Sequence, residues 1–106
     1  MDPLLQLQID HLEQKFREIE PRAGIHPEAR ELCIEALTCE LPRLREYGLS
    51  GSSRQATETL LAASHSYHLV ASRIAEAEKI RQMMDVAFTR TAESFLAKHP
   101  SAAPQS

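Results

Sequence analysis

Two histidines three residues apart, His65 and His68, are the side chains in this sequence best suited to binding a metal ion or moving a proton. They lie on either side of Tyr67 in the stretch AASHSYHLVASR. In a helix both histidines would lie on one face, but two ligands are too few for a structural zinc site, which normally takes four. We therefore expect an exposed pair without a dedicated role and no cofactor, with metal binding across an oligomer interface as the alternative.

The cysteines and serines offer no specific signature of a nucleophile. Cys33 and Cys39 lie roughly 9 Å apart along the axis of a predicted helix, beyond disulfide reach, so both are expected to pack as small apolar side chains. The serines of SGSS and SHS are explained by a helix cap and an outer helix face. Because neither a GxSxG motif nor a glycine-rich phosphate loop occurs, we predict that the protein is not an enzyme and has no small-molecule substrate.

The composition behind these residues is typical of an all-α protein. Hydrophobic residues make up 42% of the 106 residues but aromatic ones only 5%, so the core must consist mainly of Leu, Ile, Ala and Met. Three glycines leave few tight reversals for a sheet. We predict a helical hairpin or three-helix bundle with a long C-terminal helix, as a single domain over residues 1–99 followed by a disordered tail, 100–106.

Charge and hydropathy narrow the range of partners. The net charge is −3 without a polybasic patch, which makes nucleic acid an unlikely partner. The apolar runs are too short to cross a bilayer, and the N-terminal MDPLLQLQID has an acidic residue where a signal peptide has a basic one. We therefore predict a soluble, cytoplasmic protein that does not enter a membrane.

Three helices are predicted, over about residues 3–20, 27–46 and 52–98. Asp2 is expected to cap the first helix, with Pro3 at its first position, where a missing N–H costs nothing. Pro42 lies inside the pattern of the second helix, which therefore either kinks there or stops and restarts. Ser52 or Ser53 should cap the third helix.

The third predicted helix carries an apolar seam with a seven-residue repeat, lettered a to g. With Leu60 at position a, that position continues as Tyr67, Ile74, Arg81, Phe88 and Phe95, and position d holds Ala63, Val70, Ala77, Met84, Thr91 and Lys98. Ile80 and Ala87 at g widen the seam in its second half. His65 and His68 fall at f and b, on the face away from the seam.

Helix lengths limit how the three helices can pack. The first two helices are roughly 27–30 Å long, whereas the third extends to about 70 Å. The first two either stack end to end along the third or form a bundle with its first half, unless the third helix kinks near residues 62–66. If a bundle forms, the second half projects with a large apolar face, which on a soluble monomer is an interaction site.

These patterns favour a non-enzymatic helical protein-binding module, such as an adaptor, a co-chaperone or an inhibitor, that acts through the long helix. The expected partner is another protein, a second copy of the chain, or both, with a dimer the favoured oligomer. The candidate partner-binding residues are Tyr67, Ile74, Ile80, Met83, Met84, Phe88, Phe95 and Leu96.

The alternative function is a dimeric helix-turn-helix transcriptional regulator. Residues 44–61 have the outline of that motif, with a short helix, a turn at Gly48 and Leu49, and a new helix that begins near Arg54 and Gln55. A recognition helix normally offers an apolar residue where Arg54 falls, and the surrounding sequence is acidic, which counts against this hypothesis.

Overall fold

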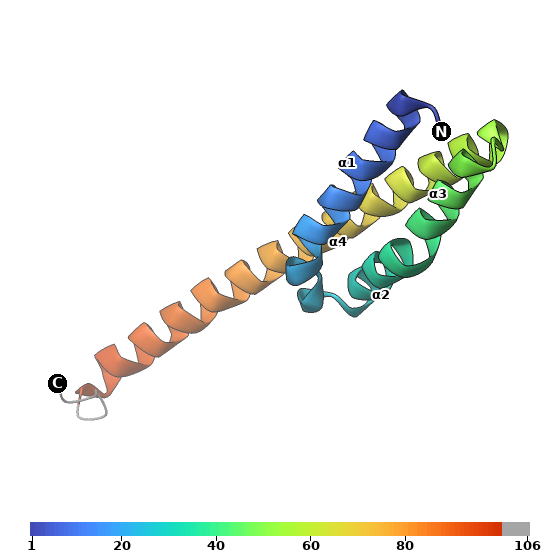
Figure 1. The fold of residues 1–106 in the computed structure, drawn as a ribbon. Helices are drawn as coiled ribbons and strands as arrows, with labels where there is room; N and C mark the ends of the chain where they lie inside the picture. The colour runs from blue at the N-terminus through green and yellow to red at the C-terminus, as the bar shows by residue number, and fades with distance from the viewer. Residues whose placement is uncertain (101–106) are drawn as a thin grey trace.

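The computed structural model describes residues 1–100 and confirms the predicted fold class, because those residues form an all-α three-helix bundle with a long C-terminal helix. Figure 1 shows two shorter helical legs lying along one half of the last helix, whose other half extends alone. The dimensions are 73 × 23 × 19 Å. Residues 101–106, which hold most of the tail predicted to be disordered, lie outside the described residues.

Helix α1, Pro3–Ile19, begins as the sequence predicts. The Asp2 side chain accepts a hydrogen bond from the Leu4 N–H at 3.0 Å, and Pro3 follows at the first helical position. One face of α1 is buried, and its members recur at helical spacing: Ile9, Leu12, Phe16 and Ile19. After α1 the chain tightens into the 3₁₀ segment η1, Glu20–Ile25, which turns it back along the bundle.

The second leg is helical throughout but contains one widened turn. Helix α2, Pro27–Glu35, is capped by His26, whose Nδ1 accepts from the Ala29 N–H at 3.2 Å. The π-helical segment η2, Ala36–Glu40, leads into α3, Leu41–Leu49.

The widened turn accommodates Pro42. A proline lacks an N–H, and its ring collides with the carbonyl four residues earlier in a regular α-helix. At η2 the Leu41 N–H donates to the carbonyl of Ala36, five residues back, so the chain accepts the proline without stopping.

Helix α4, Ser53–Lys98, is one uninterrupted α-helix of 46 residues, so of the alternatives left open by the sequence it is the continuous helix, without a break near residues 62–66, that the structure has. The turn before it contains Gly51, whose φ of 77° is a conformation that glycine adopts without strain. Ser52 occupies the N-cap position of α4, although its side chain makes no capping hydrogen bond.

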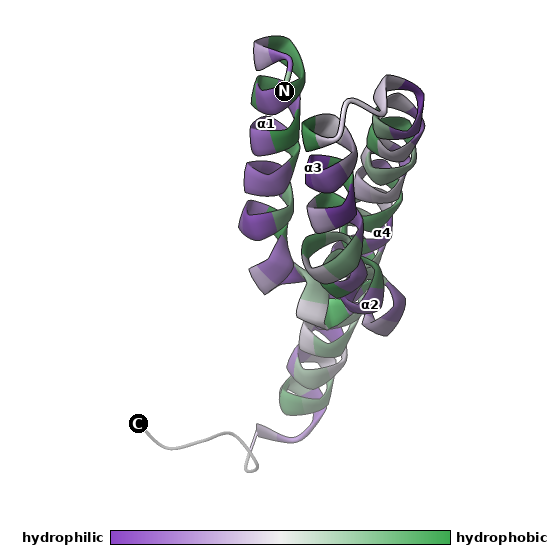
Figure 2. Ribbon diagram, turned by 45° about the vertical axis from the view of Figure 1, so that its right-hand side comes forward, coloured by the Kyte–Doolittle hydropathy of each residue, from purple (hydrophilic) through white to green (hydrophobic). Residues whose placement is uncertain are grey.

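The core lies between the two legs and the first half of α4. The α4 residues in it are Ala56, Ala63, Val70 and Ile74, which occupy positions a and d of the predicted repeat. Facing them are the buried side of α1 and, from the second leg, Ala29, Cys33, Ala36, Leu41 and Leu44. In Figure 2 the hydrophobic side of α1 faces the other helices and its hydrophilic side faces outward. We call residues 3–78 the bundle.

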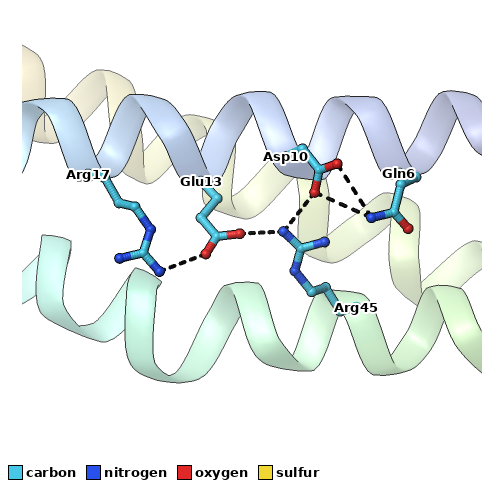
Figure 3. A network of polar contacts seen from close by, with 5 residues as sticks. All are labelled: Gln6, Asp10, Glu13, Arg17 and Arg45. Carbon is cyan, nitrogen blue, oxygen red and sulfur yellow. Dashed lines mark hydrogen bonds and ion pairs between the residues drawn. The ribbon is translucent and has the colours of Figure 1, made fainter.

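An ion-pair network joins α1 to α3 on the rim of the bundle (Figure 3). Arg45 of α3 pairs with Asp10 at 2.9 Å and with Glu13, and Glu13 also pairs with Arg17 at 2.9 Å. Hydrogen bonds from Arg17 and then from Arg45 lower the pKa of Glu13 below its ordinary value. Gln6 completes the network by donating to Asp10 at 3.3 Å. The Glu13 carboxylate is therefore held in its charged form where the two legs meet.

Candidate protein-binding surface

The second half of α4 leaves the bundle and, within residues 1–100, packs against no other α-helix. We call residues 79–98 the arm, and none of them is buried. Figures 1 and 2 show the arm continuing straight on from the bundle, with hydrophobic stretches that face no neighbouring helix. At about 1.5 Å per residue the arm is roughly 30 Å long, which is as long as either leg.

Large apolar side chains are concentrated on the arm. Those at least half exposed are Ile80, Met83, Met84, Val86, Phe88 and Phe95, and Phe88 reaches 76%. Five of these six belong to the predicted binding residues, and Leu96, another of that set, is partly exposed. Large apolar patches on a protein surface commonly mark interaction sites.

Two of the predicted binding residues lie inside the bundle. Ile74 is fully buried, and Tyr67 is partly buried with its ring edge-on to Phe16 at a centroid distance of 5.5 Å. Lys15 lies over the Tyr67 ring, 5.3 Å from its centroid. Both side chains therefore stabilise packing within the chain, and the candidate surface begins after them.

Most of the exposed apolar residues of the arm form a stripe along one side, and three lie outside it at positions c, f and b: Met83, Val86 and Leu96. Ile80, Met84, Ala87 and Phe88 occupy positions g, d, g and a of the repeat, and Phe95 continues it at a. A seven-residue repeat on a straight helix drifts by about 20° per heptad. The stripe therefore winds slowly around the arm, as it does on helices that pair with another helix.

Some exposed apolar residues escaped the sequence analysis. Val86 lies at position f, opposite the stripe, and is 50% exposed. Leu4, Leu7 and Leu61 are each more than 60% exposed on the bundle, and Leu4 and Leu61 line one shallow groove between α1 and α4. Their only signal in the sequence is that each leucine falls outside the seam of its helix.

The arm and the bundle differ in charge. The arm has four basic residues and two acidic ones, a net charge of +2, whereas residues 1–78 have eight basic and thirteen acidic residues, a net charge of −5. Arg81 and Lys98 lie at seam positions of the arm, and Arg90 lies outside the seam at position c. A partner that covers the stripe must therefore tolerate or neutralise basic groups.

The base of the arm is fixed to η1 by one ion pair. Arg22 pairs with Glu78 at 2.5 Å, and both side chains are more than a third exposed. A shallow groove opens beside this pair and is lined by Pro21, Arg22, Gly24, Ile25, Glu78, Arg81, Gln82 and Asp85. The last well-packed turn of α4 therefore lies next to η1, and the arm starts there.

The histidines and cysteines singled out in the sequence lie apart from the arm. His65 and His68 are exposed on the bundle, and no group of three or more His, Cys, Asp or Glu side chains within residues 1–100 is placed to hold a metal ion. Cys33 is buried with its Sγ 3.5 Å from the carbonyl of Phe16, and burial raises the pKa of its thiol. Cys39 is exposed and free, so the prediction that both cysteines pack as apolar side chains is wrong for it.

The segment considered for DNA recognition has the geometry of a helical hairpin. Helices α3 and α4 run antiparallel and pack side by side (Figure 1), whereas the helices of a helix-turn-helix meet at about 90–120°. The Arg54 side chain is 91% exposed and pairs with Glu58 at 3.2 Å.

Within residues 1–100, no helix combines the length and the apolar character needed to cross a membrane. Comparison of the chain with protein-family models, with curated proteins and with solved structures finds no match to any of them.

Proposed function

We propose that the protein is a non-enzymatic helical protein-binding module of the cytoplasm, an adaptor, co-chaperone or inhibitor, which binds its partner through the apolar stripe of the arm. The observation that supports this proposal most strongly is the exposure of the stripe. Met84, Phe88 and Phe95 are more than half exposed on a stretch of helix in which no residue is buried. Covering such side chains contributes roughly 25 cal/mol per Å² of apolar surface, so a partner gains stability directly from the contact.

The difference in coverage between the two halves of α4 supports the same proposal. The first half is covered by the two legs and η1, and Ile74 at its end is fully buried. The core of residues 3–78 is thus complete without the arm, and the arm is free to contact another chain. An apolar helix face of this kind commonly docks against a helix or a helix-lined groove of its partner.

Photo-crosslinking in the native cell tests the proposal directly. p-Benzoylphenylalanine in place of Phe88 puts the reactive ring in the stripe, and the same residue in place of Thr89 puts it about 100° around the helix as a matched control. We expect ultraviolet light to produce a covalent protein adduct from position 88 and little or none from position 89. Equal adducts from both positions, or none from either, would contradict a binding role for the stripe.

Paired substitutions provide a second test. Met84→Asp with Phe88→Asp places two charges in the stripe, whereas Gln82→Asp with Thr89→Asp places them on the opposite side of the arm. All four positions are exposed, so both variants should keep the helical content of the wild type by circular dichroism. Only the first pair should abolish the adduct formed at Phe95 by a second probe.

A further inference from the structure

We propose that the stripe is covered by the arm of a second copy of this chain, running antiparallel, so that two copies form a symmetric dimer through residues 77–95. This inference rests on the proposed function, because it names the partner of the same surface. The two arms meet helix to helix in one register, which their side chains select.

The repeat of the stripe favours a single long helix as the occupant. Positions a and d continue through the arm at the seven-residue spacing of a two-stranded coil, and g adds Ile80 and Ala87. Because the stripe drifts around a straight helix, a partner that follows it must wind with it. A second arm has the same period and the same length and can therefore contact the stripe from end to end.

One antiparallel register matches large side chains with small or flexible ones. In antiparallel pairs position a faces position d of the other helix, so Phe88 can face the partner's Met84. Phe95 then faces the partner's Ala77, and Arg81 faces the partner's Thr91. Near the two-fold axis, Ala87 lies beside the partner's Ala87, where small side chains let the helices approach closely. Symmetry repeats each contact, as an isologous dimer requires.

The two neighbouring registers are excluded by charge and by burial. A shift of one heptad in one direction sets Arg81 against the partner's Lys98, a like-charge contact inside the seam. A shift in the other direction sets Phe95 against the partner's Val70, which the bundle already covers completely. Of the three registers, the intermediate one alone avoids a like-charge pair in the seam and also keeps both phenylalanines away from the covered part of α4.

Charge also complements this arrangement at the ends of the contact. Beyond Phe95, Lys98 reaches the level of the partner's bundle base, where Glu76 and Glu78 lie, each paired within its own chain with Arg73 and Arg22 respectively. The arm carries +2 and residues 1–78 carry −5, so each basic tip approaches an acidic body. Near the axis the two Asp85 side chains approach each other, but each lies one helical turn from the Arg81 of its own chain.

The area available is sufficient for a specific dimer. The two phenylalanines of one arm can bury roughly 300 Å². Counting both copies, and adding Ile80 and Met84, the contact reaches on the order of 1,000 Å², the lower limit for a specific protein interface.

Light scattering tests the dimer with the full chain. We expect the wild type at about 50 µM to show twice the monomer mass of 11.9 kDa. The Met84→Asp, Phe88→Asp variant should show the monomer mass with unchanged helical content, whereas the Gln82→Asp, Thr89→Asp control should stay dimeric. A monomeric wild type would overturn the inference.

Cysteine pairing tests the direction and the register. In a Cys39→Ser background, with Cys33 left buried, Met84→Cys and Phe88→Cys chains are oxidised separately and then as a mixture in which one chain carries a size tag. The antiparallel register predicts a mixed disulfide between the two chains and no disulfide in either one alone. Rapid linking of Met84→Cys to itself would indicate a parallel dimer and overturn the inference.

The outcomes separate this inference from the proposed function. If the wild type is a monomer but the probe at Phe88 captures a different protein, the stripe binds proteins and the second copy is the wrong occupant. If it is a monomer that forms no adduct and sediments with anionic lipid vesicles, the stripe binds a lipid surface and both proposals fail.

Discussion

The two halves of α4 present the same repeat to different surroundings, and their side chains differ accordingly. Inside the bundle, position d of the seam holds the small, fully buried Ala56 and Ala63, and the larger side chains at position a are buried or partly buried: Leu60, Tyr67 and Ile74. In the arm, Met84 at position d and Phe88 and Phe95 at position a are all more than half exposed. Small residues let the legs approach α4 closely, whereas the larger side chains of the arm are left exposed within residues 1–100. The repeat is thus covered by the two legs in the first half of α4 and uncovered in the second.

Ion pairing also differs between the bundle and the arm. In the bundle Arg45 and Glu13 form part of a network, and Arg22 pairs with Glu78. Among residues 1–100 no ion pair involves a side chain of the arm. Some charges of the bundle are thus paired within the chain, whereas those of the arm are not among residues 1–100.

The largest expected effect comes from removing a phenylalanine from the packed region. Phe16 is fully buried and contacts Tyr67, so Phe16→Ala should lower the free energy of unfolding by about 3–5 kcal/mol. Phe88→Ala, which removes the same atoms from the arm, should change it by less than about 0.5 kcal/mol in dilute solution. Urea denaturation followed by circular dichroism measures both.

These two variants directly test whether the bundle and the arm differ in packing. If Phe88→Ala destabilises the dilute protein as much as Phe16→Ala does, Phe88 belongs to a folded core and the distinction between bundle and arm is lost.

A smaller effect is expected at the rim of the bundle and depends on pH. Because the pKa of Glu13 is lowered in the folded protein, its contribution to stability is present above the ordinary glutamate pKa and is lost as the pH falls through the lowered value. Glu13→Gln should therefore cost roughly 1 kcal/mol at neutral pH and little in strong acid. Urea midpoints measured across the acid range test this, and a constant difference between variant and wild type at all pH values would contradict it.

For Glu40, which also lies in the bundle, we expect the opposite dependence of stability on pH. Burial, and then the charge of Glu35, raise the pKa of Glu40, and within the described part of the chain its buried Oε2 has no hydrogen-bond partner. A raised pKa means that the stability present at low pH is lost as the pH rises through the raised value. Glu40→Gln should therefore stabilise the protein by up to about 1 kcal/mol at pH 7 and not in acid, as thermal melts at the two pH values would show.

The sequence predicted the helices and the seam but not where the bundle ends. The cap at Asp2, the proline at the first position of α1 and the positions buried in α4 all follow from local patterns. Ile74 and Ile80, however, lie on the same repeat, and the first is fully buried while the second is 52% exposed. The boundary between them is set by the length of α1 and by η1, where the chain turns back, and no periodicity records it.

The π turn of the second leg and the ion pairs on the rim of the bundle could not be predicted from the sequence either. Pro42 indicated an irregularity, but a π turn, a kink and a stop are all ways to accommodate a proline, and the surrounding tertiary packing selects among them. The contact of Arg45 with Glu13 joins residues 32 positions apart, and only the packing of α3 against α1 brings them together.

The smallest expected effect is at the start of α4. Arg54 is almost fully exposed and pairs only within its own helix, so Arg54→Ala should change the free energy of unfolding by less than about 0.5 kcal/mol. Under the DNA-binding alternative the same substitution would abolish a salt-sensitive interaction with a duplex. We expect neither the wild type nor the variant to retard a mixed-sequence duplex at low salt, because residues 1–78 carry −5 and α3 packs lengthwise along α4. Retardation of the wild type that Arg54→Ala removes would move the functional surface from the arm to the bundle and reverse the comparison between the two regions.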